Sequence, residues 1–118
     1  MTIAELRDLC LSLPGTSYDF PFDEETIVFR VGGKMFGLAG INENPVSVNL
    51  KCDPILARDL RAGYEGIEPG YHMNKEHWNT VRCGSDVPDE QLEWLVRHSY
   101  DLVVEKLPKK RRPGVREQ

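Results

Sequence analysis

The sequence lacks the features that mark membrane and secreted proteins. None of the apolar runs in its 118 residues approaches the roughly 20 residues of a membrane-spanning helix, so we expect no transmembrane segment. The first residues place Glu5, Arg7 and Asp8 among apolar side chains, unlike the unbroken apolar stretch of a secretory signal. We therefore expect a cytoplasmic protein that does not bind membranes.

Cysteine is also scarce. The chain has three cysteines, Cys10, Cys52 and Cys83, which are far apart and form no Cys-x-x-Cys pair. An odd number of widely spaced cysteines is typical of reduced thiols and not of a disulfide framework. We predict buried, structural thiols.

The sequence has no pair of ligands at the spacing of a zinc site. His72 and His77 are five positions apart. The other potential ligands lie elsewhere in the chain and are Cys52, Asp53 and Cys83. We therefore predict no metal, no cofactor and no catalytic residues. The alternative is a small-ligand or metal-dependent enzyme in which His72 or His77 acts as a base beside the Cys52 thiol.

The net charge of −4 is unevenly distributed along the chain. Residues 109–118 hold five basic groups and one acidic group, which leaves a net charge of −8 on residues 1–108. A chain of this length supports one domain. We expect a single domain over residues 1–108 and a flexible basic tail over residues 109–118.

The N-terminal part of the chain predicts a helix over about Ile3 to Leu13. Thr2 and Glu5 form a capping box before apolar residues at helical spacing, and Pro14-Gly15 ends the pattern. The next segment, Thr16 to Asp23, is rich in proline and aromatic residues and has no clean periodicity. We predict an ordered loop there.

The centre of the chain predicts three antiparallel strands and a helix. Residues on two faces alternate over Thr26 to Val31 and over Val46 to Lys51, and a Gly32-Gly33 turn joins the first of these strands to a strand over Lys34 to Ala39. A short helix then begins after the N-cap residue Asp53 and ends near Gly63. Its expected apolar face comprises Ile55, Leu56 and Leu60.

The last third of the chain predicts a second hairpin and a long helix. Tyr71 to Met73 and Trp78 to Cys83 are expected to pair around the turn Asn74 to Glu76. Apolar residues at helical spacing then follow the acidic residues beside Pro88, and Pro108 ends the pattern.

Several short sequence blocks follow one another in the predicted order α-β-β-β-α-β-β-α. The blocks are Leu13-Pro14-Gly15, Phe20-Pro21-Phe22, Gly33-Lys34-Met35-Phe36, Leu50-Lys51-Cys52-Asp53, Pro69-Gly70-Tyr71-His72-Met73-Asn74-Lys75, His77-Trp78-Asn79-Thr80-Val81 and Ser99-Tyr100. With these blocks the chain resembles the MmcQ/YjbR family over nearly its whole length. The resemblance implies an α+β protein, a two-layer α/β sandwich with an antiparallel sheet, related in shape to secretion chaperones and CyaY-like proteins. It also implies a bacterial DNA-binding protein whose hairpins form a double wing, and no established catalytic activity.

The segment Pro69 to Trp78 is the strongest candidate for a binding site. Burial of this segment would require a hydrogen-bond partner for each imidazole and amide, so we expect an exposed loop or strand edge that contacts a ligand. Nucleic acid would be bound by lysines at phosphates, by aromatic and imidazole rings at bases or sugars, and by the basic tail. The candidate residues are Lys34, Lys51, Tyr71, His72, Asn74, Lys75, His77 and Trp78. The acidic pI of about 5.4 indicates that such binding is weak and salt-sensitive.

A protein- or peptide-binding module is the alternative function. An exposed sheet edge, or the surface from Tyr71 to Trp78, would then receive a client segment, as in a chaperone, or a second copy of the chain, as in a homodimer. Salt would weaken nucleic-acid binding much more than an apolar protein interface. Two of the aromatic residues also have a structural interpretation, with Trp78 in the core and the Tyr100 hydroxyl bonded to the backbone.

Overall fold

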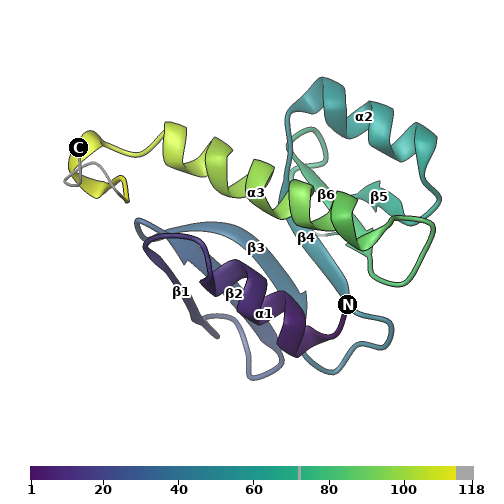
Figure 1. The fold of residues 1–118 in the computed structure, drawn as a ribbon, viewed down its shortest axis with the longest axis horizontal. Coiled ribbons are helices and arrows are strands. Elements are labelled where there is room, and N and C mark those ends of the chain that lie inside the picture. The colour runs from purple at the N-terminus through teal and green to yellow at the C-terminus, as the bar shows by residue number, and fades with distance from the viewer. Residues whose placement is uncertain (72, 114–118) are drawn as a thin grey trace.

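The computed structural model describes residues 1–71 and 73–113, and Figure 1 shows their fold. A six-stranded antiparallel sheet has the strand order β1-β2-β3-β4-β6-β5. The strands are β1 (Thr16–Asp19), β2 (Thr26–Val31), β3 (Lys34–Gly40), β4 (Ser47–Lys51), β5 (Ile67–Pro69) and β6 (Trp78–Arg82). The helices are α1 (Ile3–Leu11), α2 (Pro54–Gly63), α3 (Asp89–Glu105) and the short 3₁₀ helix η1 (Lys109–Arg111). The predicted α+β fold with an antiparallel sheet is confirmed.

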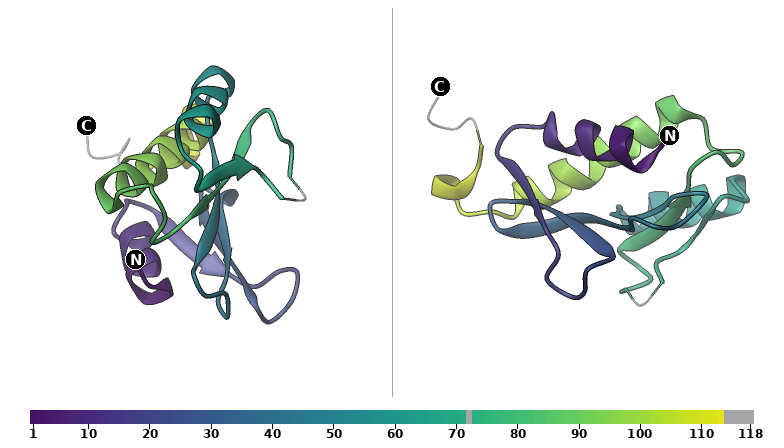
Figure 2. Two further views of the ribbon diagram at one scale, coloured as in Figure 1. Left: turned by 90° about the vertical axis from the view of Figure 1, so that its right-hand side faces the viewer. Right: turned by 90° about the horizontal axis from the view of Figure 1, so that it is seen from below.

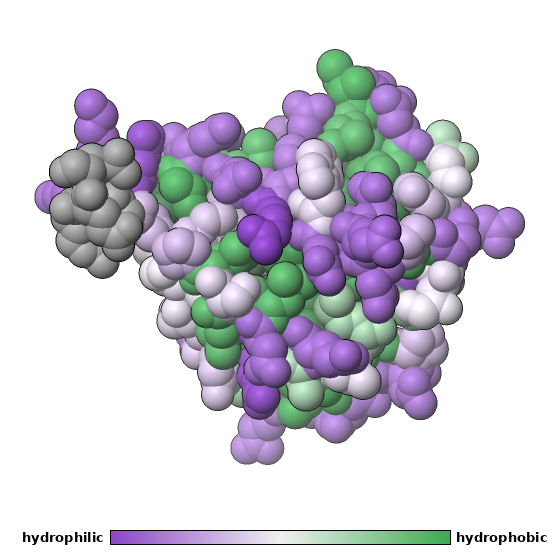
Figure 3. All heavy atoms as spheres, viewed as in Figure 1, coloured by the Kyte–Doolittle hydropathy of each residue, from purple (hydrophilic) through white to green (hydrophobic). Residues whose placement is uncertain are grey.

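The helices lie on one side of the sheet. Figures 1 and 2 show α1 and α3 against one face, with α2 beside the β5 end. In the part of the chain that the structure describes, no helix covers the opposite face, next to which the β1–β2 and β5–β6 loops project (Figure 2). On the helical side, hydrophilic residues cover much of the surface, with hydrophobic residues visible between them (Figure 3). Within residues 1–71 and 73–113, none of the helices has the length and hydropathy to cross a membrane.

We call the uncovered side the open face of the sheet. Alternation along paired strands assigns its residues, because side chains of directly paired residues lie on the same face. They include Val28 and Arg30 of β2, Met35 and Leu38 of β3, Ser47, Asn49 and Lys51 of β4, and Trp78, Thr80 and Arg82 of β6. Trp78 is buried with 9 % of its surface exposed, but as the cross-strand partner of Lys51 it belongs to this face. Its burial agrees with the structural interpretation of Trp78, although it lies outside the core cluster on the helix side.

The core fills the space between the sheet and the helices. Ile27, Phe29 and Val31 of β2 are buried there with apolar residues of α1 and α3. Phe36 is fully buried, and its ring packs edge-on against Tyr100 with ring centroids 5.6 Å apart. Burying a side chain of this size stabilises the fold by roughly 1.5–3 kcal/mol. The Tyr100 hydroxyl donates a hydrogen bond to a backbone carbonyl oxygen, which confirms its structural interpretation.

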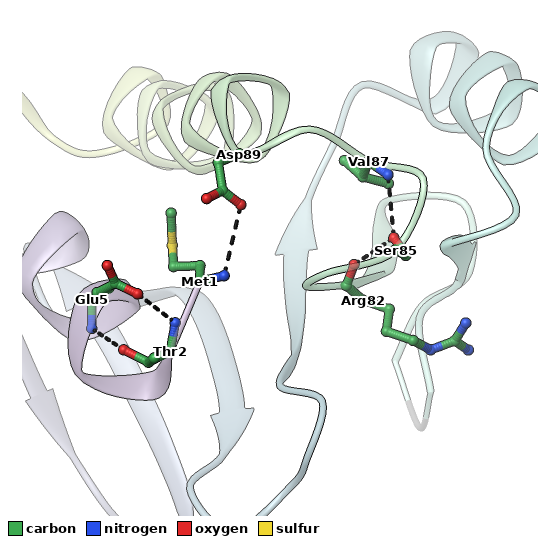
Figure 4. A network of polar contacts seen from close by, with 7 residues as sticks. All are labelled: Met1, Thr2, Glu5, Arg82, Ser85, Val87 and Asp89. Carbon is green, nitrogen blue, oxygen red and sulfur yellow. Dashed lines mark hydrogen bonds and ion pairs between the residues drawn. The ribbon is translucent and has the colours of Figure 1, made fainter.

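Polar contacts connect the start of the chain to α3 (Figure 4). Thr2 and Glu5 form the predicted capping box, with both hydrogen bonds present. The N-terminal ammonium of Met1 lies 3.7 Å from the Asp89 carboxylate at the start of α3. Because Asp89 is in the first turn, its charge also favours the positive end of the helix dipole. These contacts fix the two helices relative to each other at one end of the sheet.

The prediction of a loop over Thr16 to Asp23 is wrong in its first half. Thr16–Asp19 forms the edge strand β1, which pairs with β2 from Thr16 opposite Val31 to Asp19 opposite Val28. Three of its four residues are exposed. An exposed strand has no buried face, and its sequence therefore lacks the alternation by which strands are recognised.

The second predicted hairpin exists, but its first strand was predicted too far toward the C-terminus. Ile67–Pro69, and not Tyr71 to Met73, pairs with β6, with Ile67 opposite Val81. Ile67 is buried in the core, whereas Tyr71 is 69 % exposed. Burial of the apolar side chain thus sets the register.

The predicted apolar face of α2 is partly wrong. Leu60 is buried and Leu56 packs partly buried against the core, as predicted, but Ile55 is 65 % exposed and the helix also buries Ala57. The predicted cap is confirmed, because the Asp53 carboxylate accepts a hydrogen bond from the backbone N–H of Leu56. The helix therefore begins as expected, but it is rotated so that small Ala57 faces the sheet.

Candidate functional site

Lysines from three parts of the chain meet at one end of the sheet. Lys34 opens β3, Lys51 ends β4 and Lys106 follows α3, and all of them line a cavity of about 490 Å³. The other lining residues are Met35, Val103 and Leu107. Among the described residues that line it, none is acidic. We call this cavity the lysine pocket.

The strand connections explain why these lysines converge. β3 begins directly after the Gly32-Gly33 turn, where both glycines have the positive φ angles that turn needs. β4 runs antiparallel to β3, so its last residue, Lys51, returns to the same end of the sheet. A Cβ atom on Gly32 would lie 2.5 Å from the end of the Leu107 side chain and 3.3 Å from the Arg111 backbone carbonyl oxygen. With its positive φ angle, this position therefore favours glycine where the chain after α3 packs on the turn.

The cations of the lysine pocket repel one another. Burial and, to a smaller extent, the Lys106 ammonium lower the pKa of Lys51 below its usual value. Both causes disfavour the charged form of Lys51. A bound anion would favour that form, so a phosphate or carboxylate in the pocket would balance the positive charge of the lysines.

More basic residues lie next to this pocket. Of the segment 109–118, which we expected to be a flexible tail, the structure describes residues 109–113. Lys109–Arg111 forms η1, and Arg112 donates hydrogen bonds to the backbone carbonyl oxygens of Leu107 and Glu105, at 2.9 and 2.8 Å. Residues 114–118 lie outside the described part of the chain. Lys109 and Lys110 thus extend the basic surface that begins at Lys106.

Several candidate residues of the Tyr71 to Trp78 segment shape the loop itself. The Lys75 ammonium donates a hydrogen bond to the carbonyl oxygen of Gly70 at 3.0 Å. The Asn74 side chain accepts bonds from the backbone N–H groups of Glu76 and His77, which confirms the predicted turn residue. The carbonyl oxygen of His77 accepts a bond from the backbone N–H of Cys52. His72 lies outside the described residues.

A second cavity, of about 460 Å³, lies on the open face and was not predicted from the sequence. Phe22 of the β1–β2 loop and Tyr71 of the β5–β6 loop line it, and these two loops project beside the sheet in Figure 2. The apolar lining also includes Met35, Leu38 and Met73, and the polar lining includes Glu43, Ser47 and Asn49. We call it the open-face groove. Met35 lines both cavities, so the groove and the lysine pocket lie next to each other at this side chain.

Two aromatic residues were the feature of the sequence from which this groove could have been predicted. Phe22 is 66 % exposed and Tyr71 is 69 % exposed. Phe22 belongs to a Phe-Pro-Phe block that we interpreted as holding a loop in place, not as binding a ligand. Only the folded structure shows that the two loops lie near one cavity.

The cysteines do not provide a reactive thiol. Cys10, Cys52 and Cys83 are buried and unpaired, as predicted. Burial, with a contribution from the Asp53 carboxylate, raises the pKa of Cys52 to about 11, so its thiol stays protonated at neutral pH and is a weak nucleophile. Within the described ranges, 1–71 and 73–113, no three His, Cys, Asp or Glu side chains group in a way that could hold a metal ion.

Comparisons with known proteins agree with the fold. The YjbR family model matches residues 11–102. The uncharacterized protein YbdF of Escherichia coli O157:H7 is 39 % identical over 110 residues, covering 93 % of this chain and 90 % of that protein. The uncharacterized protein YjbR of Escherichia coli K12 is 36 % identical over 112 residues and 95 % of each chain.

A solved structure extends this similarity to three dimensions. The crystal structure of the Deinococcus radiodurans protein DR2400, with the family domain DUF419, has a TM-score of 0.90 and 42 % sequence identity, and covers 97 % of this chain and 87 % of that one. The matched family model, the sequence identities and the shared fold lead to one conclusion, which is that this chain belongs to the YjbR family.

Proposed function

We propose that this protein binds the phosphate groups of a nucleic acid at the lysine pocket and at the adjacent basic residues of η1. The observation that carries this proposal is the convergence of Lys34, Lys51 and Lys106 around a cavity whose described lining has no acidic side chain. Phosphates would be contacted by the ammonium groups, and a bound phosphate would offset the burial and the Lys106 charge that lower the pKa of Lys51.

The charge distribution sets the strength of this binding. Five of the six lysines, all except Lys75, are in the lysine pocket or within four positions of Lys106. The net charge is nevertheless −4, so the rest of the surface repels a polyanion. We expect weak binding that is lost as salt rises, because phosphate contacts release counterions.

Salt titrations of single variants test the proposal. Fluorescence anisotropy of a labelled DNA oligonucleotide, in single-stranded and in duplex form, gives Kd at several salt concentrations. Lys51→Ala and Lys106→Ala should each weaken binding at low salt and reduce the slope of log Kd against log salt by roughly 0.7–1, the value of one phosphate contact.

Lys75→Ala is the matched control, because its ammonium is bonded to the Gly70 carbonyl oxygen within the β5–β6 loop. Its slope should equal that of the unmodified protein. No binding of either DNA form at low salt, or equal slopes for Lys51→Ala and the unmodified protein, would contradict the proposal.

A second candidate function is binding of a peptide or a second copy of the chain. It is favoured by the edge strand β1, where Tyr18 is 46 % exposed and neighbouring Phe20 is 41 % exposed beside an apolar cavity against α1. An apolar interface of this kind would be salt-tolerant. Light scattering at low and high salt distinguishes it: a dimer that persists at high salt supports this candidate.

A further inference from the structure

The open-face groove gives the lysine pocket an aromatic extension. Phe22 and Tyr71 come from loops that connect strands at opposite ends of the strand order, and both line the groove. Met35 lines both cavities, so the groove and the pocket adjoin at this side chain. A ligand that occupies both cavities would therefore have an anionic part near the lysines and a flat or apolar part near the aromatic rings.

A hydrogen-bond chain holds one wall of the groove in place. The backbone N–H of Tyr71 donates to the Thr80 hydroxyl at 3.2 Å, and this hydroxyl donates to Asn49 Oδ1 at 2.6 Å. With Oδ1 occupied, the Nδ2 group of Asn49 is the side-chain donor that remains at the groove. The Glu43 carboxylate adds an acceptor. The groove thus offers a donor, an acceptor and aromatic surface, which is what recognition of a nucleobase edge and face requires.

We propose that the bound form of nucleic acid is a single strand, with an unpaired base in the open-face groove beside Phe22 and Tyr71 and its phosphates at Lys34, Lys51 and Lys106. This inference rests on the proposed function and adds the class of nucleic acid. Sequence-tolerant stacking of bases on aromatic side chains beside a basic surface is the usual basis of single-strand binding.

The charges near the groove argue against a duplex. Glu43 lines the groove, and Asp23 and Glu25 lie with it around the next cavity. These carboxylates would repel a second phosphate backbone, whereas they can accept hydrogen bonds from the amino groups of an unpaired base. Stacking inside a duplex also hides the base faces from Phe22 and Tyr71.

Helix α3 does not offer an alternative site for a duplex. The exposed residues of α3 include five acids and one arginine, namely Asp89, Glu90, Glu93, Asp101, Glu105 and Arg97. Such a helix would be repelled by the phosphates that border the major groove. A base would therefore lie on the open face, and the phosphates at the adjoining end of the sheet, where Lys106 after α3 also lines the lysine pocket.

Anisotropy with matched single-stranded and duplex oligonucleotides at about 50 mM salt tests this inference. The single strand should bind on the order of tenfold more tightly, and Phe22→Leu and Tyr71→Leu should each weaken its binding by roughly fivefold or more. Both side chains are largely exposed, so these variants should fold.

Phe20→Leu is the matched control, because Phe20 is exposed in the same loop but lines the cavity against α1. It should leave Kd unchanged. If Phe22→Leu and Tyr71→Leu bind normally, or if the duplex binds as tightly, the inference fails. The proposed function stands in that case, provided that Lys51→Ala and Lys106→Ala still weaken binding. Equal affinity for a mononucleotide would also overturn the inference, because the other nucleotides of the single strand would then contribute nothing to binding.

Discussion

At the scale of single residues, Ser99 connects the core to the lysine pocket. Its side chain is fully buried in α3. The hydroxyl donates a hydrogen bond to the Phe36 carbonyl oxygen and accepts one from the backbone N–H of Lys51 at 2.9 Å. One small polar side chain thus satisfies backbone groups at the ends of β3 and β4. Lys51 is placed beside Lys106 through this contact.

Ser99→Ala is expected to lower the free energy of unfolding by about 1–3 kcal/mol, because two buried backbone groups lose their partner. Urea unfolding followed by circular dichroism measures this loss. Ser17→Ala, on the exposed strand β1, is the control and should change stability by less than about 0.5 kcal/mol. Equal stabilities of the two variants would show that water replaces the Ser99 hydroxyl.

At the scale of elements, the β5–β6 connection depends on close approach of the backbone to a tryptophan. A Cβ atom on Gly70 would lie 2.8 Å from the Trp78 Cβ atom and 3.0 Å from the Trp78 carbonyl oxygen. The carbonyl belongs to the backbone of β6 and cannot move as a side-chain end can. The loop that carries Tyr71 into the groove therefore starts from a position that only glycine can occupy.

Gly70→Ala should destabilise the protein by about 1–3 kcal/mol through overpacking. Gly63→Ala is the opposite case: Gly63 is in the last turn of α2, and an added Cβ atom has nothing within 4 Å. This variant should raise the unfolding free energy by up to about 1 kcal/mol, because alanine loses less conformational entropy in a helix. Thermal and urea unfolding of the pair should show shifts of opposite sign; shifts of the same sign would contradict the structure.

At the scale of the whole molecule, the lysines attract a nucleic acid locally, whereas the net negative charge of the protein repels it. The basic residues cluster at the end of the sheet beside the lysine pocket, while the net charge of the chain is −4. Long-range repulsion acts over about one Debye length, roughly 10 Å at 0.1 M salt. Acids on α3, on the helical side of the sheet (Figure 2), therefore affect a ligand on the open face only at low salt.

Neutralising Glu93 and Asp101 of α3 together, as Glu93→Gln and Asp101→Asn, should strengthen DNA binding without a new contact. We expect a gain of about two- to threefold at low salt that disappears as the Debye length shortens. Anisotropy at several salt concentrations measures it. A gain that persists at high salt would instead place these residues in the interface.

Local signals in the sequence account for the parts of the fold that were predicted correctly. The Thr2 and Glu5 capping box, the Asp53 cap and the Gly32-Gly33 turn depend on neighbours within a few positions. Alternation along β4 and helical spacing along α3 likewise reflect one buried face. β1 and the register of β5 were missed because an exposed edge strand and a three-residue strand have too little pattern.

The candidate site could be predicted only in part. Lys34, Lys51 and Tyr71 were identified from their residue type, and the structure brings the first two together with Lys106, which was not singled out. It places Tyr71 in the neighbouring groove with Phe22. Lys75, in contrast, is bonded within its own loop.

The sequence by itself determined the helices, the first hairpin, the α+β class and the family, because these follow from short-range spacing and from sequence blocks in a fixed order. Only the tertiary structure decided which side of the sheet is left open and which lysines share a pocket. Those features depend on the antiparallel return of β4 beside β3 and on the packing of Leu107 against Gly32. Contacts between such distant segments arise from long-range packing, and no local sequence pattern encodes them.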